Sequence, residues 1–167
     1  MSGTPSEILL ERLREAGLSI AVAESLTAGM LASELAAVAG ASDVFVGGVV
    51  AYSNAVKQSI LGVSAQSLES AGAVSEDVAV QMAQGVQEAF GAASGLTAND
   101  VVSLATTGVA GPSQAEGKPV GTVFIAARLG GRSLVQSYHF DGDRQQIREF
   151  SSRAAIALAE QLLDGAL

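Results

Sequence analysis

The chain of 167 residues has no cysteine, no tryptophan and one histidine, and each absence narrows the chemistry open to it. Without cysteine, a thiol nucleophile, a disulfide framework and a cysteine-ligated metal site are all excluded. The one histidine, His139, excludes multi-histidine metal sites and leaves a Ser–His–Asp triad with a single candidate base. Aromatic residues make up only 4% of the chain, so the core has to be built from Ala, Val, Leu and Ile.

Charged residues are also few, at 16% of the chain, against about 25% in typical globular domains. Nine Lys and Arg face seventeen Asp and Glu, which gives a net charge of −8. The chain therefore lacks the positive charge typical of nucleic-acid-binding proteins. It also lacks the run of about 20 apolar residues that spans a bilayer and the basic-then-apolar pattern of a secretory signal. We expect a cytoplasmic protein with no nucleic-acid or membrane partner.

Apolar residues make up 49% of the chain, which is ample for the core of one domain over residues 1–167. Strands are predicted at 18–23, 44–52, 101–105, 120–129 and 133–140, the second of them buried and the last two joined by a turn at Gly130 and Gly131. Helices are predicted at 6–16, 30–38, 54–62, 64–71, 75–93 and 143–163, with Ser6 and Ser75 among the caps. This order predicts a three-layer α/β/α sandwich with a mixed, mostly parallel sheet.

Ser25 is the first candidate functional residue, because it follows an apolar strand and precedes a helix. Such a junction places the hydroxyl at the carboxyl end of a strand, beside the free N–H groups of a helix start. These N–H groups could stabilise an oxyanion or a phosphate. The alternative is that Ser25 or Thr27 simply caps the helix.

A second candidate is the segment of Tyr52, Ser53 and Asn54 together with Lys57, where another strand ends and a helix begins. A lysine acts as a general base only when it is neutral, so burial or a nearby cation has to lower its pKa. The alternative is a solvated surface lysine, the commoner environment of this residue. The chain contains only one other lysine, Lys118.

A third candidate is the Gly- and Pro-rich loop predicted at 106–119, which begins with Thr106, Thr107 and Gly108. Glycines allow backbone conformations that turn several N–H groups toward one anion. The sequence matches neither a P-loop nor a dinucleotide-binding motif. A purely structural turn is the alternative.

A fourth candidate is the start of the last helix, where Asp143 is a natural cap and Arg144 and Arg148 lie one turn apart. The two arginines could bind a carboxylate or a phosphate, and the alternative is a capped helix with surface arginines. His139 lies on a predicted strand among apolar neighbours and is interpreted as structural or, at most, an edge contact.

Six short motifs occur in order along the chain, at 23–29 (AESLTAG), 52–54 (YSN) with Lys57, 72–76 (GAVSE), 107–112 (TGVAGP), 118–123 (KPVGTV) and 140–144 (FDGDR). Together they resemble the CinA carboxy-terminal domain family, which includes stand-alone nicotinamide-nucleotide amidases, over about residues 6–163. Two positions depart from the family pattern: Leu26 replaces a Cys, and Ala28 replaces the first of two glycines. These departures bear on how a substrate fits.

The resemblance implies an amidohydrolase that converts nicotinamide mononucleotide (NMN) into nicotinic acid mononucleotide and ammonia without a metal or cofactor. It implies Ser25 as nucleophile, neutral Lys57 as base and Tyr52 as the residue that orients Lys57. Backbone N–H groups at a helix start or in residues 107–111 would stabilise the oxyanion. The substrate-binding residues would be Thr27, Asn54, Thr107, Gly108 and Arg144, with Arg144 on the phosphate.

Two other interpretations stay open from the sequence. The domain could be a non-catalytic nucleotide-binding or competence-associated regulatory module, which would bind NMN without releasing ammonia. It could also hydrolyse another amide, such as a related pyridine or ribosyl compound. The family resemblance further implies a homodimer or higher homo-oligomer.

Overall fold

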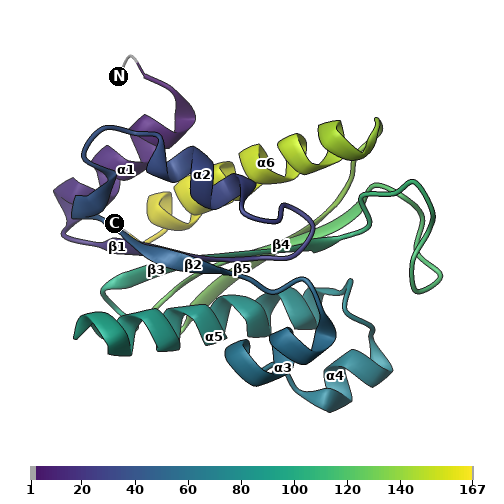
Figure 1. The fold of residues 1–167 in the computed structure, drawn as a ribbon. Coiled ribbons are helices and arrows are strands. Elements are labelled where there is room, and N and C mark those ends of the chain that lie inside the picture. The colour runs from purple at the N-terminus through teal and green to yellow at the C-terminus, as the bar shows by residue number, and fades with distance from the viewer. Residues whose placement is uncertain (1–2, 167) are drawn as a thin grey trace.

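The computed structural model describes residues 3–166, which form a five-stranded sheet between two layers of helices (Figure 1). The strands are β1 (Ser19–Glu24), β2 (Phe45–Val50), β3 (Val101–Gly108), β4 (Thr122–Leu129) and β5 (Arg132–His139). One face of the sheet is covered by α1 (Pro5–Ala16), α2 (Met30–Ala36) and α6 (Arg144–Asp164). The other face carries α3 (Asn54–Leu61), α4 (Ala65–Ser70) and α5 (Glu76–Ser94), and a short 3-10 helix, Ala41–Asp43, precedes β2.

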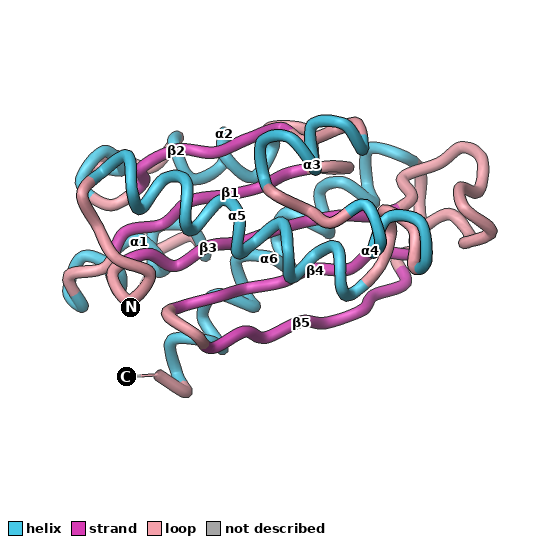
Figure 2. The backbone as a smooth tube through the Cα atoms, turned by 90° about the horizontal axis from the view of Figure 1, so that it is seen from below, coloured by secondary structure: helices cyan, strands magenta, loops and turns pink. Residues whose placement is uncertain are grey.

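The strand order is β2-β1-β3-β4-β5, as Figure 2 shows from below. Strand β1 pairs in parallel with both β2 and β3, whereas β4 is antiparallel to β3 and to β5. Among the five strands of residues 3–166, β4 therefore runs against the other four. The predicted three-layer α/β/α sandwich with a mixed, mostly parallel sheet is confirmed.

The two faces of the central strand β1 differ in side-chain size. Ile20 and Val22 pack into the core beneath α1, α2 and α6, whereas Ala21 and Ala23 face the core beneath α5. All four side chains are fully buried, as expected for a parallel strand covered on both faces. Small residues on the second face leave room for α5 to lie close to the sheet.

Helices α3 and α5 touch at the backbone, and the contact requires glycine. A Cβ atom built on Gly85 of α5 would lie 1.9 Å from the carbonyl oxygen of Leu61 at the end of α3. Any side chain at this position would push the two helices apart, so Gly85 fixes how closely α3 approaches α5. Helix α3 carries Lys57, whose position therefore depends on this contact.

The first helix begins earlier than the sequence predicts. Thr4, not Ser6, is its N-cap: the Thr4 hydroxyl accepts a hydrogen bond from the Glu7 N–H, and the Glu7 carboxylate accepts one from the Thr4 N–H. Pro5 takes the first helical position, where its missing N–H costs nothing. Ser6 lies inside the helix, buried, and donates to Glu34. The predicted caps Ser75 and Asp143 are confirmed, and Ser53 caps α3.

Two strand predictions are corrected by the pairing. Strand β2 was expected to be buried, but it is an edge strand and Val50 is 49% exposed. Strand β3 was expected to end at Ala105, but it continues to Gly108 because Thr106, Thr107 and Gly108 pair with β4. The irregular loop therefore begins after Gly108. The predicted turn at 130–131 is confirmed.

No helix among residues 3–166 combines the length and the apolar character that crossing a membrane requires.

Candidate functional site

A cavity of about 190 Å³ lies at the carboxyl ends of the three parallel strands. These ends meet at one edge of the sheet because β1 pairs in parallel with both neighbours, and ligand sites of open α/β sheets lie at such edges. Ser25 follows β1, Tyr52 follows β2 and Thr107 lies near the end of β3. The lining residues are Ser25, Leu26, Tyr52, Asn54, Lys57, Ala73, Val74, Thr107, Gly108, Ala110, Ala115, Glu116 and Arg144.

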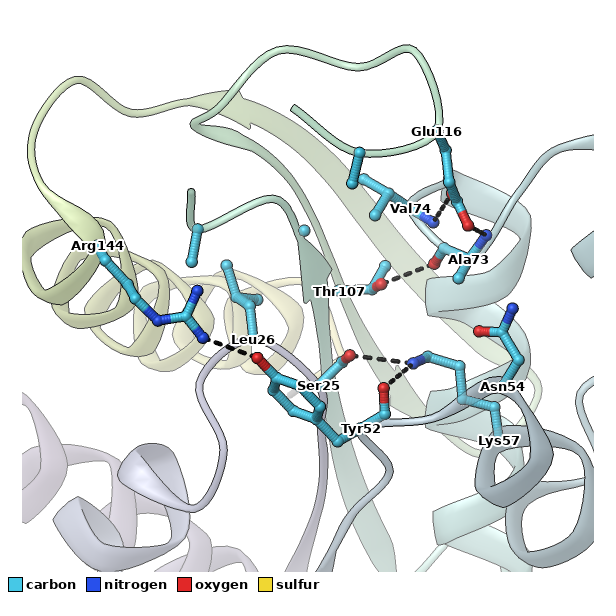
Figure 3. A pocket seen from close by; sticks show the side chains of 13 residues that line it. Ser25, Leu26, Tyr52, Asn54, Lys57, Ala73, Val74, Thr107, Glu116 and Arg144 are labelled. Atoms are coloured by element: carbon cyan, nitrogen blue, oxygen red, sulfur yellow. Dashed lines mark hydrogen bonds between the residues drawn. The ribbon is translucent and has the colours of Figure 1, made fainter. Parts of the chain in front are cut away.

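Ser25 and Lys57, which are 32 positions apart in sequence, face one another in this cavity (Figure 3). The Lys57 Nζ atom donates to Ser25 Oγ at 3.0 Å and to the carbonyl oxygen of Ala51 at 2.9 Å. A longer contact of 3.5 Å joins Nζ to the carbonyl oxygen of Tyr52. All three acceptors are uncharged, so they orient the amine without fixing a positive charge on it.

Burial changes the acidity of Lys57. Its side chain is 2% exposed, and loss of solvation lowers the pKa of Lys57 below its usual value of 10.5. The negative charge of Glu116 opposes this shift and raises the pKa of Lys57 by a smaller amount. The surface-lysine alternative is thus wrong, and the pKa of the amine is shifted in the direction that favours its uncharged form.

The N–H groups at the start of α2, expected to be free beside Ser25, are occupied by Glu24. Its carboxylate, 1% exposed, accepts hydrogen bonds from the N–H groups of Gly29 (3.0 Å), Leu31 (3.0 Å) and Ala32 (2.8 Å). This corrects the expectation of an anion site at that helix start. It also answers the capping alternative: Gly29 is the N-cap residue of α2, with no side-chain cap, so Ser25 does not cap the helix.

Thr27 does not line the cavity, although the resemblance implies a substrate-binding role for it. Its side chain is fully buried, and its hydroxyl lies 2.7 Å from that of Thr106 on β3. The Ser25 N–H also donates to the Thr106 carbonyl oxygen at 2.9 Å. Both contacts attach the turn after β1 to the neighbouring strand, so Thr27 supports the position of Ser25.

Tyr52 and Arg144 form one side of the cavity mouth. The Arg144 guanidinium donates to the Tyr52 hydroxyl at 2.7 Å and to the carbonyl oxygen of Gly111 at 2.6 Å. The Tyr52 hydroxyl therefore bonds Arg144 and not Lys57, and only the Tyr52 main chain approaches Lys57. The expected orienting of Lys57 by Tyr52 could therefore act only through the Tyr52 carbonyl oxygen and not through its hydroxyl. Arg144 brings a positive charge to the site from the other face of the sheet.

The opposite wall is formed by residues 73–74 and the loop that carries Glu116 (Figure 3). The Glu116 carboxylate accepts from the N–H groups of Ala73 (3.0 Å) and Val74 (3.1 Å). The buried Thr107 hydroxyl donates to the Ala73 carbonyl oxygen at 2.7 Å. Thr107 lines the cavity as expected, but its hydroxyl proton is used within the wall.

Two other predicted residues, Asn54 and Gly108, line the cavity. Arg148, considered as a partner of Arg144 on an anion, does not line it and instead binds the carbonyl oxygens of Leu26 and Thr27. His139 is an exposed residue of the edge strand β5 and lies outside the cavity lining, as its interpretation implied. Sequence reasoning assigned no role to Glu24 or Glu116. Glu24 could have been noticed because it stands directly before Ser25.

Within residues 3–166, no group of three or more His, Asp and Glu residues is arranged to hold a metal ion. The polar side chains at the cavity include the Ser25 hydroxyl, the Lys57 amine and the Arg144 guanidinium, with the Glu116 carboxylate opposite. A hydroxyl beside a buried amine of lowered pKa can lose its proton to that amine and become a nucleophile, and the guanidinium can bind an anion.

The fold and the site define an α/β/α domain with a buried serine–lysine pair at the carboxyl edge of its sheet. The model of the CinA C-terminal domain matches residues 3–163. The chain belongs to the CinA C-terminal domain family.

Relatives and solved structures agree with this assignment. A CinA-like protein of Mycolicibacterium vanbaalenii is 48% identical over 152 residues, and one of Thermotoga neapolitana is 46% identical over 151 residues. Each match covers 90% of this chain but only 34% and 35% of the relative, so the chain spans about a third of the length of these curated relatives.

Among solved structures, a competence-damaged protein (CinA) superfamily protein from Escherichia coli is similar, with a TM-score of 0.87 and 38% identity over 95% of this chain and 88% of its own. The competence/damage inducible protein CihA from Agrobacterium tumefaciens has a TM-score of 0.81 and 35% identity, over 98% of both chains. The fold is thus the CinA-superfamily fold.

Proposed function

We propose that the protein is an amidohydrolase that converts NMN into nicotinic acid mononucleotide and ammonia. The observation that carries the proposal is the 3.0 Å contact between Lys57 Nζ and Ser25 Oγ. A serine needs an adjacent base to become a nucleophile, and burial of Lys57 favours the uncharged amine that can act as one. The proposed reaction uses no metal or cofactor, and we retain the cytoplasm as the predicted location.

In the proposed mechanism, neutral Lys57 takes the proton of the Ser25 hydroxyl while Oγ attacks the carboxamide carbon. The tetrahedral intermediate collapses, its C–N bond breaks, and the lysine ammonium gives a proton to the departing nitrogen, which leaves as ammonia. Lys57 is then neutral again and takes a proton from a water molecule, which attacks the acyl-enzyme. The second tetrahedral intermediate collapses, the bond from its carbon to Ser25 Oγ breaks, and the lysine ammonium returns a proton to Oγ as the carboxylic acid leaves. Each step returns Lys57 to the state that the next step requires.

The anionic end of the substrate is assigned to Arg144. Its guanidinium bonds only uncharged oxygens, those of Tyr52 and Gly111. A phosphate would accept charge-assisted hydrogen bonds from it, which are shorter and stronger than those to neutral groups. Tyr52, Asn54, Thr107 and Gly108 would line the space between the phosphate and Ser25.

Ammonia release from NMN by the purified protein tests the proposal. The wild-type protein should release ammonia and nicotinic acid mononucleotide in equal amounts, and Ser25→Ala should not. Arg153→Ala is a matched control, because Arg153 is an exposed residue of α6 outside the cavity lining. Turnover by Ser25→Ala at the wild-type rate would refute the nucleophile, and no release by the wild type would refute the substrate.

A non-catalytic role is the second candidate, and it is favoured by the length of the relatives. The matched CinA-like proteins are about three times as long as the shared region, so this domain also occurs within longer chains. A regulatory module should bind NMN in calorimetry without releasing ammonia.

Assaying nicotinamide riboside and other pyridine amides beside NMN would reveal a different amide substrate. Light scattering would test the predicted homodimer or higher homo-oligomer.

A further inference from the structure

Arg148 of α6 binds the main chain of the turn that carries Ser25. Its Nε donates to the Leu26 carbonyl oxygen at 3.0 Å, and its Nη2 donates to the Thr27 carbonyl oxygen at 3.0 Å. A planar guanidinium holds two consecutive carbonyl groups in a fixed relation, which a lysine cannot do. The side chain is half-buried, and its third nitrogen, Nη1, donates to Gln145 on the same helix.

Glu24 holds the other end of the same turn. Its carboxylate accepts from three N–H groups at the start of α2, whereas the guanidinium of Arg148 binds carbonyl groups. The N–H of Ala28 donates to the carbonyl oxygen of Ser25 at 3.1 Å, which closes the turn. The turn is therefore held by side chains from two different elements, by Arg148 at Leu26 and Thr27 and by Glu24 from Gly29 onward.

Two N–H groups of this turn, those of Leu26 and Thr27, have no acceptor among residues 3–166, and of these two residues only Leu26 lines the cavity. In the part of the chain that the structure describes, no hydrogen bond is donated by the N–H of Leu26 or of Thr27. The C=O and N–H of a trans peptide group point in opposite directions. Because Arg148 binds the Leu26 carbonyl, the N–H of Thr27 in the same peptide group points away from Arg148. Leu26 itself lines the cavity beside Ser25.

We propose that Arg148 is a positioning residue, which fixes the turn after Ser25 through the Leu26 and Thr27 carbonyls so that the N–H of Leu26, which lines the cavity, can bind the oxyanion. This inference rests on the proposed function, since the oxyanion forms when Ser25 attacks an amide. Preorganised backbone donors next to a nucleophile stabilise charge that appears only in the transition state. Loss of Arg148 should therefore lower kcat and leave KM nearly unchanged.

Steady-state kinetics with NMN test the inference in three variants. Arg148→Ala should lower kcat by about 100-fold, the size of effect seen when one oxyanion donor is lost, with KM within threefold of wild type. The kcat of Arg148→Lys should lie between those of wild type and Arg148→Ala, because an ammonium cannot bind both carbonyls in one plane. Arg153→Ala, on the same helix, should match wild type. A kcat of Arg148→Ala within threefold of wild type overturns the inference.

Chemical rescue separates positioning from general destabilisation. Guanidinium ion added to Arg148→Ala should restore kcat at least tenfold and in a saturable manner, because it can occupy the space of the lost side chain. It should not raise the kcat of Arg148→Lys, in which that space is filled. Equal or absent effects on both variants would mean that Arg148 acts only on stability, and would overturn the inference.

Labelling of Ser25 by phenylmethylsulfonyl fluoride, followed by intact-protein mass, distinguishes failure of this inference from failure of the proposed function. Sulfonylation also develops negative charge on oxygen beside Ser25, so Arg148→Ala should react at least tenfold more slowly than wild type. If wild type does not hydrolyse NMN but shows this difference, the substrate is wrong and the positioning role holds. If wild type and Arg148→Ala are labelled equally fast, the positioning role is wrong. It is also wrong if wild type is not labelled and Arg148→Ala has the kcat of wild type.

Discussion

Two serines follow neighbouring strands and precede helices, yet they lie in opposite environments. Ser53, between β2 and α3, is exposed, and its hydroxyl accepts a hydrogen bond from the Val56 N–H at 3.3 Å as an ordinary cap. Ser25, between β1 and α2, is 8% exposed, and its hydroxyl accepts from the Lys57 amine. A serine at a strand–helix junction is thus free for other chemistry only when the helix is capped by something else.

The residue that makes this difference is Glu24. Its carboxylate takes three N–H groups of α2, the kind of group that Ser53 takes in α3. The connection is also longer: residues 25–29 form the turn before α2, and Ala28 (φ 48°) and Gly29 (φ 93°) adopt left-handed conformations. Releasing Ser25 from capping therefore requires a buried carboxylate and a strained turn.

The largest expected effect is the difference in kcat between the two serine-to-alanine variants. Ser25→Ala should lower kcat for NMN by about 1,000-fold or more, because it removes the proposed nucleophile. Ser53→Ala should leave kcat within twofold, since its hydroxyl only caps α3. Ammonia release measures both variants, and equal losses would remove the contrast between the two junctions.

Lys57→Met tests the amine that distinguishes the environment of Ser25 from that of Ser53. Removing the base should lower kcat by about 1,000-fold, while Met fills the buried space of the side chain. In the wild type, kcat/KM should rise with pH as Lys57 loses its proton, with a midpoint below 10.5 because burial lowers the pKa of Lys57. A wild-type profile with its midpoint at 10.5 or above would contradict a buried base.

The same pKa shift predicts how stability depends on pH. Between the lowered folded pKa of Lys57 and its unfolded value, the unfolded chain binds a proton that the folded chain does not. The free energy of unfolding of the wild type, relative to that of Lys57→Met, should therefore increase as pH rises through this window. Urea titrations at pH 7 to 10 measure the difference, and a constant or decreasing difference would refute the shift.

Arg144→Ala tests the distal end of the cavity that Ser25 opens into. Loss of charge-assisted hydrogen bonds to a phosphate costs about 1.5–3 kcal/mol, so KM for NMN should rise about 10- to 100-fold. KM for nicotinamide riboside, which has no phosphate, should change less than threefold. A similar rise for both compounds would show that Arg144 does not bind the phosphate.

A smaller effect is expected on the stability of the ordinary junction. Ser53→Ala should lower the free energy of unfolding by about 1 kcal/mol, the usual value of a helix cap. Urea denaturation measures it, and Ser53→Asp, which retains a capping oxygen, is the matched control and should be close to wild type. If alanine and aspartate are equally stable, Ser53 does not act as a cap.

The smallest effect is expected on the free energy of unfolding when the strain in the turn before α2 is removed. Ala28 holds a left-handed conformation that glycine adopts freely, so Ala28→Gly should raise the free energy of unfolding by about 0.5 kcal/mol. Ala32→Gly, in the regular part of α2, is the control and should lower it. Destabilisation by both substitutions to the same degree would mean that the turn is unstrained.

Local patterns predict much of this molecule. Apolar runs and glycine stops give the five strands and the six α-helices of residues 3–166, though not the 3-10 helix Ala41–Asp43, and the three-layer order follows from their alternation. Ser25 and Lys57 are found from their place after predicted strands, because parallel strands deliver their carboxyl ends to one edge. Tyr52, Asn54 and Arg144 come from the motifs at 52–54 and 140–144, and the cavity brings them together.

The parts that the sequence does not predict depend on contacts between distant segments. The extension of β3 to Gly108 depends on pairing with β4, and the exposure of β2 depends on its place at the sheet edge. Glu116 contacts residues 73–74 only because a long loop folds back over more than 40 positions. Local propensity contains no information about such approaches, which explains why Glu116 received no role and Arg148 a different one.

The contact between Gly85 and the Leu61 backbone bears on how the site of Ser25 and Lys57 can vary over evolution. Helix α3 rests on α5 at an atom-to-atom distance that leaves no space for even a methyl group. The lysine that α3 carries can therefore be relocated by a change at a residue outside the lining of the cavity. Searching for altered reactivity among homologous chains should start from this helix crossing as much as from the cavity itself.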